Sequence, residues 1–252
     1  TQIGIPFIFA FIIGIILTGL LGFILERTFL RPMVGEPVFS VAVLTIGIDI
    51  LLRVVLDNWI GINPKYMGDP FPSYGNFGSL NIGGLTVKYL EVTALITSLV
   101  LISILSVFFK RSKYGVAMRA TSLDQEAALA QGINVGRVFG LVWFIAGLLA
   151  AFAGFFITGG FNTLTNTSFI SALRALPAVV IGGLDSITGA IIGSLIIGLT
   201  QAYVGYYQFD IESAYNIKLG NGFSIVAPYL IMFVILLVKP HGLFGTEEVE
   251  RV

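Results

Sequence analysis

The chain has 252 residues, of which 56% are hydrophobic and only 11% are charged, and its mean hydropathy is +0.94. Soluble domains carry about 25% charged residues, so this composition excludes an ordinary soluble protein and indicates a polytopic membrane protein. The formal net charge of zero argues against nucleic acid as a partner, and the lack of cysteine excludes disulfides and Cys-ligated metals.

The chain begins TQIGIPF, apolar and without a basic segment, so it does not resemble a signal peptide, and we expect the natural protein to begin earlier. About 20 apolar residues cross a bilayer core. Apolar runs of suitable length predict spans over residues 3–25, 38–56, 89–109, 138–158 and 223–238.

The stretch 169–206 differs from these runs because it carries Arg174 and Pro177 and is interrupted at Gly182-Gly183. It predicts two short or broken helices, 169–184 and 187–206, which either span the membrane or re-enter it. We therefore expect an all-α transmembrane helical bundle that forms one domain over residues 1–252.

Lys and Arg are distributed unevenly between the two sides of the predicted bundle. Nine of them fall on the side that holds the loop 110–137 and the C-terminus, and at most five on the other. By the positive-inside rule, the loop 110–137 and the C-terminus are expected in the cytoplasm.

The large outer loop, 57–88, is rich in Gly, Pro and aromatic residues. Near its end SLNIGGLTVKYL predicts a small β-hairpin around Gly83-Gly84. A structured loop of this length is often functional, but its aromatic residues also fit an interfacial belt.

The cytoplasmic loop contains a short Ala-rich helix, predicted over Leu123 to Gln131. Thr121 or Ser122 is expected to cap its start, and Gly132 is expected to end it in the left-handed conformation. This helix is either a docking surface for another protein or a connecting helix whose positive flanks aid membrane insertion.

Three charged residues, Asp49, Arg53 and Asp57, share one face of the second span. Ionisable groups in a membrane are functional candidates by default, but these residues could also form a self-satisfying ion pair near the interface. Arg174 has the same two interpretations: it either meets a solute carboxylate or snorkels outward from a helix end.

Small residues concentrate in one stretch, where they predict close helix packing by Gly182, Gly183, Gly189 and Gly193. No GxxxxGK[ST] phosphate loop occurs in the sequence, so any ATP would be bound by another subunit and no cofactor is expected in this chain. We find no catalytic constellation, and the single histidine, His241, has no partner cluster. The expected activity is therefore not enzymatic, and no metal site is predicted.

Several stretches resemble a known family. Glu126-Ala127-Ala128, followed by Gly132, resembles the EAA motif of ABC importer permeases, although the motif's later Ile-x-Leu-Pro portion is not present. LRALPAVVIGGLDSITGAIIGSLIIGL, TIGIDILLR and the ending KPHGLFG resemble the branched-chain amino acid ABC permeases, in particular the LivH-type subunit. The resemblance covers essentially the whole chain, which then lacks the family's first membrane segments.

The resemblance implies inward transport of branched-chain amino acids or similar small neutral solutes across the plasma membrane. It implies four kinds of partner: a second, LivM-like permease, two ABC ATPase subunits, an extracytoplasmic solute-binding protein and the bilayer. The coupling residues it implies are Arg119, Ser122, Asp124, Glu126, Ala127, Ala128 and Gly132. The family usually has small or neutral polar residues where Asp49 and Arg53 stand, so this chain departs from it there.

Two other functions remain open at this stage. Urea and short-chain amide permeases share the same stretches. An ATP-independent secondary transporter or channel, with Asp49 and Arg53 as an ion site, belongs to a different class.

Overall fold

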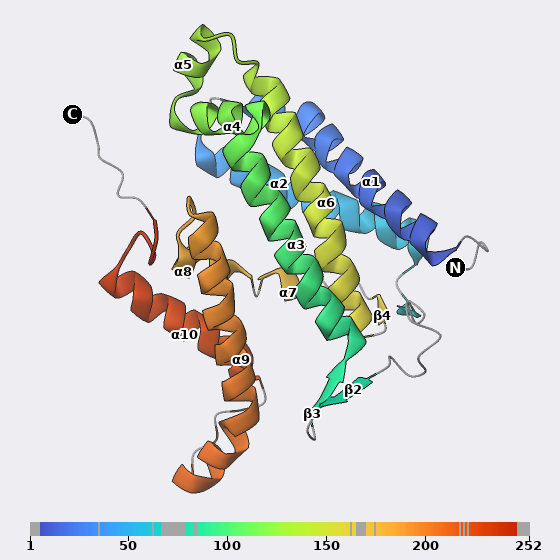
Figure 1. Ribbon diagram of the computed structural model, residues 1–252, viewed down its shortest axis with the longest axis vertical. Helices are drawn as coiled ribbons and strands as arrows, with labels where there is room; N and C mark the ends of the chain where they lie inside the picture. Colours follow the sequence, from blue (N-terminus) through green and yellow to red (C-terminus); the bar gives the residue numbers. More distant parts are fainter. Residues whose placement is uncertain are drawn as a thin grey trace. The chain divides into compact units, whose positions relative to one another are not determined.

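The structure is a computed structural model that describes residues 6–34, 36–61, 63–66, 79–82, 85–161, 163–164, 170–173, 175–216, 218, 220 and 222–245. Within these residues, five helices are long and apolar enough to cross a membrane, which confirms the predicted all-α polytopic fold class. The chain folds as two compact units, Thr1–Asn166 and Thr167–Val252. The first unit contains α1 to α6, and the second contains α7 to α10 (Figure 1).

The helices of the first unit are α1 (Phe7–Leu25), α2 (Val38–Ile60), α3 (Tyr89–Arg111), α4 (Lys113–Leu123), α5 (Gln125–Ala130) and α6 (Val135–Phe161). A π-helical turn, η1 (Glu26–Leu30), and a 3₁₀ turn, η2 (Arg31–Met33), follow α1 directly. Pro6 and Pro37 precede α1 and α2 in extended conformation, and their carbonyls accept the first helical hydrogen bonds.

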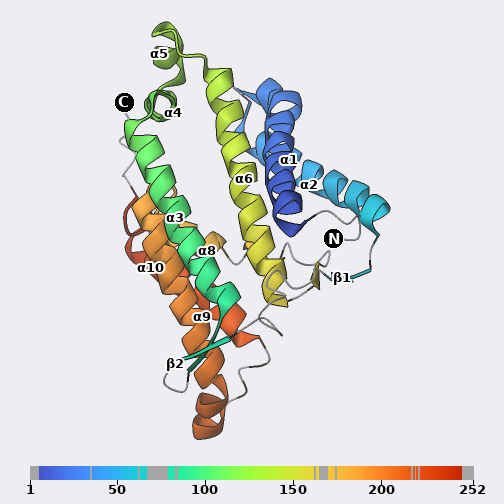
Figure 2. The same ribbon diagram turned by 45° about the vertical axis from the view of Figure 1, so that its right-hand side comes forward.

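Helices α1 and α6 pack closely along their length (Figures 1 and 2). Gly19 lies against Leu148, and a Cβ at this glycine would approach the Leu148 side chain to 2.8 Å. At the other end of the pair, the rings of Phe11 and Phe155 lie 4.7 Å apart. Close approach at small residues and packing of aromatic rings therefore hold the two helices together as one rigid pair.

Two small antiparallel sheets lie at the end of the first unit away from α4 and α5 (Figure 1). Strands β1 (Lys65–Tyr66) and β4 (Thr163–Leu164) join the segments that follow α2 and α6. Strands β2 (Ser79–Ile82) and β3 (Leu85–Lys88) pair with Ile82 opposite Leu85. The predicted hairpin is therefore confirmed, and it leads directly into α3.

The second unit consists of two short helices, α7 (Ile170–Leu173) and α8 (Leu176–Gly182), and two longer ones, α9 (Ile187–Tyr215) and α10 (Phe223–Val238). Helix α9 continues to Tyr215, so the predicted end of this helix at residue 206 was wrong. Gln208, which is buried, explains the difference: its amide donates to Glu212 at 2.9 Å and to the Gly220 carbonyl at 2.7 Å. These bonds satisfy the polar side chains without ending the helix.

The core of the second unit lies where α8 meets α9, and Ile181 is fully buried there. A Cβ at Gly182 would collide with the backbone of Gly189, so only glycine permits this approach. The segment after α10 returns to the same place. The amides of Leu243 and Phe244 donate to the carbonyls of Ile181 and Gly182 at 2.8 and 3.1 Å, which satisfies carbonyls that the end of α8 leaves free.

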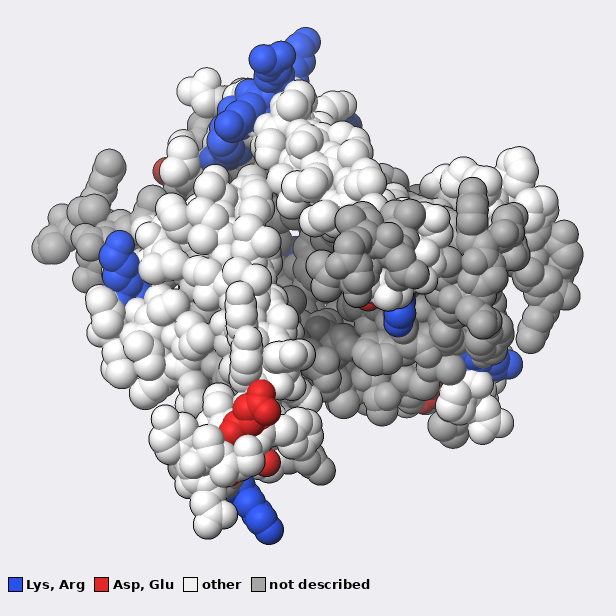
Figure 3. All heavy atoms as spheres, turned by 60° about the horizontal axis from the view of Figure 1, so that its bottom comes forward, with Lys and Arg blue, Asp and Glu red and all other residues white. Residues whose placement is uncertain are grey.

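In Figure 3, Lys, Arg, Asp and Glu occupy small areas of the described surface, and uncharged residues make up most of it. Large apolar side chains are exposed along α1, α2 and α3. Such apolar helix faces fit a hydrocarbon environment.

Candidate functional site

Helix α4 folds back on the end of α3, with Ser112 as the only residue between them. The Ser112 hydroxyl accepts from the Gly115 amide at 2.8 Å and so caps α4. A Cβ at Gly115 would lie 2.5 Å from the Phe109 carbonyl oxygen, and the Arg119 guanidinium donates to that same oxygen. Arg119 therefore neutralises a carbonyl at the negative end of α3, a local task that its sequence position did not reveal.

The short helix of the loop 110–137, α5, begins at Gln125, two residues later than predicted, and its cap was wrongly assigned. Asp124 is the N-cap, and its carboxylate accepts from the Ala127 amide at 2.9 Å. Thr121 and Ser122 belong to the last turn of α4, where their hydroxyls donate to the carbonyls of Ala117 and Arg119. Both hydroxyls are thus used to continue α4 rather than to start α5.

The end of α5 follows the prediction. Gly132 has a φ of +79°, its amide donates to Leu129, and the amide of Ile133 donates to Ala128. These two bonds form a Schellman motif, which satisfies carbonyls at the helix end. Capped at both ends, α5 has a defined geometry despite its six residues.

Helix α5 is held by one side chain and exposes the others. Ala128 is only 3% exposed, whereas Glu126, Ala127 and Leu129 are exposed. Figures 1 and 2 show α4 across the end of α3 and α5 beyond α4. The loop therefore presents a small, rigid, partly apolar helix to whatever lies on that side.

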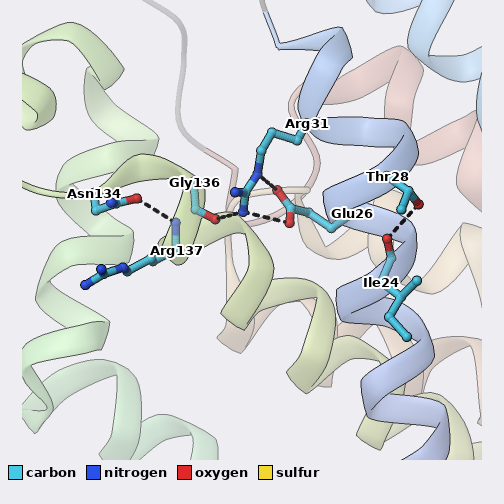
Figure 4. A network of polar contacts seen from close by, with 7 residues as sticks. All are labelled: Ile24, Glu26, Thr28, Arg31, Asn134, Gly136 and Arg137. Carbon is cyan, nitrogen blue, oxygen red and sulfur yellow. Dashed lines mark hydrogen bonds and ion pairs between the residues drawn. The ribbon is translucent and has the colours of Figure 1, made fainter.

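A polar cluster that the sequence did not predict fixes the start of α6 (Figure 4). Glu26 is 1% exposed and accepts two hydrogen bonds from Arg31, at 3.2 and 3.1 Å. The same guanidinium donates to the Gly136 carbonyl of α6 at 2.6 Å. One arginine thus joins the end of α1 to the first turn of the helix that follows α5. We call this group, Glu26, Arg31 and Gly136, the clamp.

The π-helical turn explains how residues five apart come together. Side chains three or four positions apart are neighbours on an α-helix, whereas those five apart diverge. In η1 the Arg31 amide donates to the Glu26 carbonyl, which brings the fifth residue back over the first. The only sequence signal was a Glu at the end of an apolar run with an Arg five positions on.

The remaining predicted residues lie in separate places. Asp49 and Arg53 form a two-bond ion pair within α2, at 2.8 and 2.9 Å. Gly182, Gly189 and Gly193 lie at the contact of α8 and α9. Gly183 has a φ of +102° and lies against the backbone of Gly245. Arg174 lies outside the described residues. Within the described chain, no three acidic or histidine side chains gather where a metal ion could bind.

The five membrane-length helices of the described residues define a multi-pass helical membrane protein. The family model described as "Branched-chain amino acid transport system / permease component" matches residues 1–238, and the chain belongs to this family. The family is one of transport permeases rather than of enzymes.

Curated relatives agree with this membership. The chain is 27% identical to the high-affinity branched-chain amino acid transport system permease protein BraD of Pseudomonas aeruginosa, over 96% of this chain and 76% of that protein. It is 30% identical to the corresponding LivH protein of Salmonella typhimurium, over 96% of this chain and 75% of that protein. The galactose/methyl galactoside import permease protein MglC of Escherichia coli is 29% identical over 54% of this chain and 44% of its own length. No solved structure matches significantly.

Proposed function

We propose that the chain is the membrane-spanning permease subunit of an ABC importer for branched-chain amino acids. The family match over residues 1–238 carries this proposal. The relatives BraD and LivH, whose similarity extends over 96% of this chain, are named for branched-chain amino acid transport.

Helix α5 is the proposed docking site for an ATPase subunit. Its exposed residues and the caps at Asp124 and Gly132 make a short, rigid, projecting helix that suits a cleft on another protein. Movement of that cleft during ATP hydrolysis would displace α5 and, through α6, the membrane helices. The loop 110–137 and the C-terminus then lie in the cytoplasm, as the distribution of Lys and Arg favours.

Replacement of exposed α5 residues tests this role in the complex assembled with the ATPases, the second permease and the binding protein. Glu126→Lys and Gly132→Val should abolish most of the leucine-stimulated ATP hydrolysis, because the first reverses a charge on the exposed face and the second strains a left-handed position. Lys113→Gln, in the same loop but on α4, is the matched control. Coupled hydrolysis that survives both α5 changes would exclude the docking role.

The substrate is proposed from the relatives' names, and it requires its own measurement. The similarity to a galactoside permease shows that related helices serve a different solute. Uptake of labelled leucine, urea and galactose by the reconstituted complex separates the proposed substrate from its competitors. Leucine uptake driven by an ion gradient, with the purified chain alone, would instead support the secondary transporter that the Asp49–Arg53 pair suggests.

A further inference from the structure

We propose that Arg31 is a positioning residue for energy coupling: through the clamp it passes the displacement of α5 to α1. This inference rests on the proposed function. It concerns a connection inside the chain rather than the docking surface itself.

The first part of the connection runs from α5 into α6 without a flexible joint. After Gly132 only Ile133 and Asn134 precede α6. The Asn134 side chain accepts from the Arg137 amide at 3.0 Å, which caps α6 (Figure 4). Hydrogen bonds thus fix the chain on both sides of this short link, so a displacement of α5 moves the first turn of α6.

The second part runs from the first turn of α6 to the end of α1. Arg31 holds the Gly136 carbonyl at 2.6 Å and the buried Glu26 carboxylate with the same planar group. A Cβ at Gly136 would lie 3.2 Å from the Arg31 guanidinium carbon, and one at Gly140 would lie 3.3 Å from a Glu26 oxygen. A side chain at either glycine would therefore press against the clamp, whose hydrogen bonds are direct.

The chemistry of the clamp suits a mechanical link. A guanidinium has several fixed donors and can hold a carboxylate and a carbonyl at once, which an ammonium point charge does less well. Because Glu26 is buried, water cannot readily replace Arg31 as its partner. Below the clamp, the close packing of α1 and α6 carries the motion along the membrane helices.

The test uses the complete transporter in lipid vesicles, with labelled leucine as the probe. Glu26→Gln together with Arg31→Gln removes the clamp without leaving a buried charge, and Arg27→Gln is the matched control because Arg27 is an exposed neighbour in the same π-turn. The ratio of leucine transported to ATP hydrolysed is measured beside assembly and basal hydrolysis. We expect the double variant to assemble normally and its ratio to fall roughly 3- to 30-fold, while Arg27→Gln keeps the wild-type ratio.

The outcomes separate the two proposals. Absence of ATP-driven leucine uptake by the wild-type complex would overturn the proposed function. Normal uptake by the wild type with an unchanged ratio in the double variant would overturn only this inference and leave the clamp a structural pair. If the double variant does not assemble, Arg31→Lys decides: an assembled complex with a reduced ratio supports the clamp, and a wild-type ratio overturns it.

Discussion

Two arginine–carboxylate pairs in this protein have similar bond lengths and different surroundings. Asp49 and Arg53 lie four residues apart on one α-helix, with side chains that are 56% and 25% exposed. Glu26 and Arg31 lie five residues apart across a π-turn, and the Glu26 side chain is 2% exposed. Arg31 also binds a distant helix, through the Gly136 carbonyl.

The difference shows that distance alone does not measure the importance of an ion pair. An exposed pair within one helix contributes little to stability. A pair with a buried carboxylate costs much more to break, because one charge is left in an apolar environment. The Glu26 pair therefore fixes tertiary structure, whereas the Asp49 pair stabilises its own helix.

The largest effect is expected from Arg31→Ala. Loss of the guanidinium leaves Glu26 charged and buried, so the protein should lose about 3 kcal/mol of stability, the lower end for such pairs because Arg31 itself is partly exposed. Thermal unfolding in detergent measures the loss. Addition of Glu26→Gln should recover most of it, and a double variant as unstable as Arg31→Ala would show that the charge is not the cause.

A smaller effect is expected from Gly140→Ala, which presses a methyl group against the clamp. The new Cβ would lie 2.7 Å from the Phe23 ring and 3.3 Å from Glu26, so overpacking should cost about 1–3 kcal/mol. Gly154 offers the matched control in the same helix, because its Cβ position is open in the isolated chain. Gly154→Ala should be neutral or slightly stabilising; equal losses at both sites would mean that helix α6 tolerates no alanine, whatever the local space.

The smallest change in stability is expected from Asp49→Asn. Its exposed i,i+4 pair predicts only a small loss of stability, against a clearly larger loss for Glu26→Gln in the same unfolding assay. Leucine uptake should be measured on the same variant. A strong fall in uptake with stability unchanged would assign the pair to the solute pathway, the other role that its sequence position suggests.

The contrast between the pairs also explains what could be predicted from the sequence. The Asp49–Arg53 pair follows from regular α-helical spacing, and Gly132 as a helix end follows from the conformational freedom of glycine. The clamp could not be predicted in this way, because it needs a π-turn and a partner 105 residues from Arg31. Long-range packing decides both, and local spacing carries little information about it.

The coupling loop shows a second limit, which arises from competition between neighbours. Thr121, Ser122 and Asp124 are all good capping residues, and the sequence alone does not rank them. The unforeseen helix α4 decides the outcome, because it uses the two hydroxyls for its own carbonyls and leaves Asp124 to begin α5. The existence of a capped helix was predictable, but the identity of its cap depended on the preceding helix.

The hydrogen bonds from Leu243 and Phe244 to the end of α8 have a consequence for biosynthesis. The ribosome makes α8 before α9 and α10, so the amides that bond to the carbonyls of Ile181 and Gly182 are synthesised only after both later helices. A buried carbonyl without a partner costs about 1–3 kcal/mol, so the short helix can reach its final state only after the last helix is made. The segment after α10 therefore completes the end of α8 only after the rest of the second unit has been made.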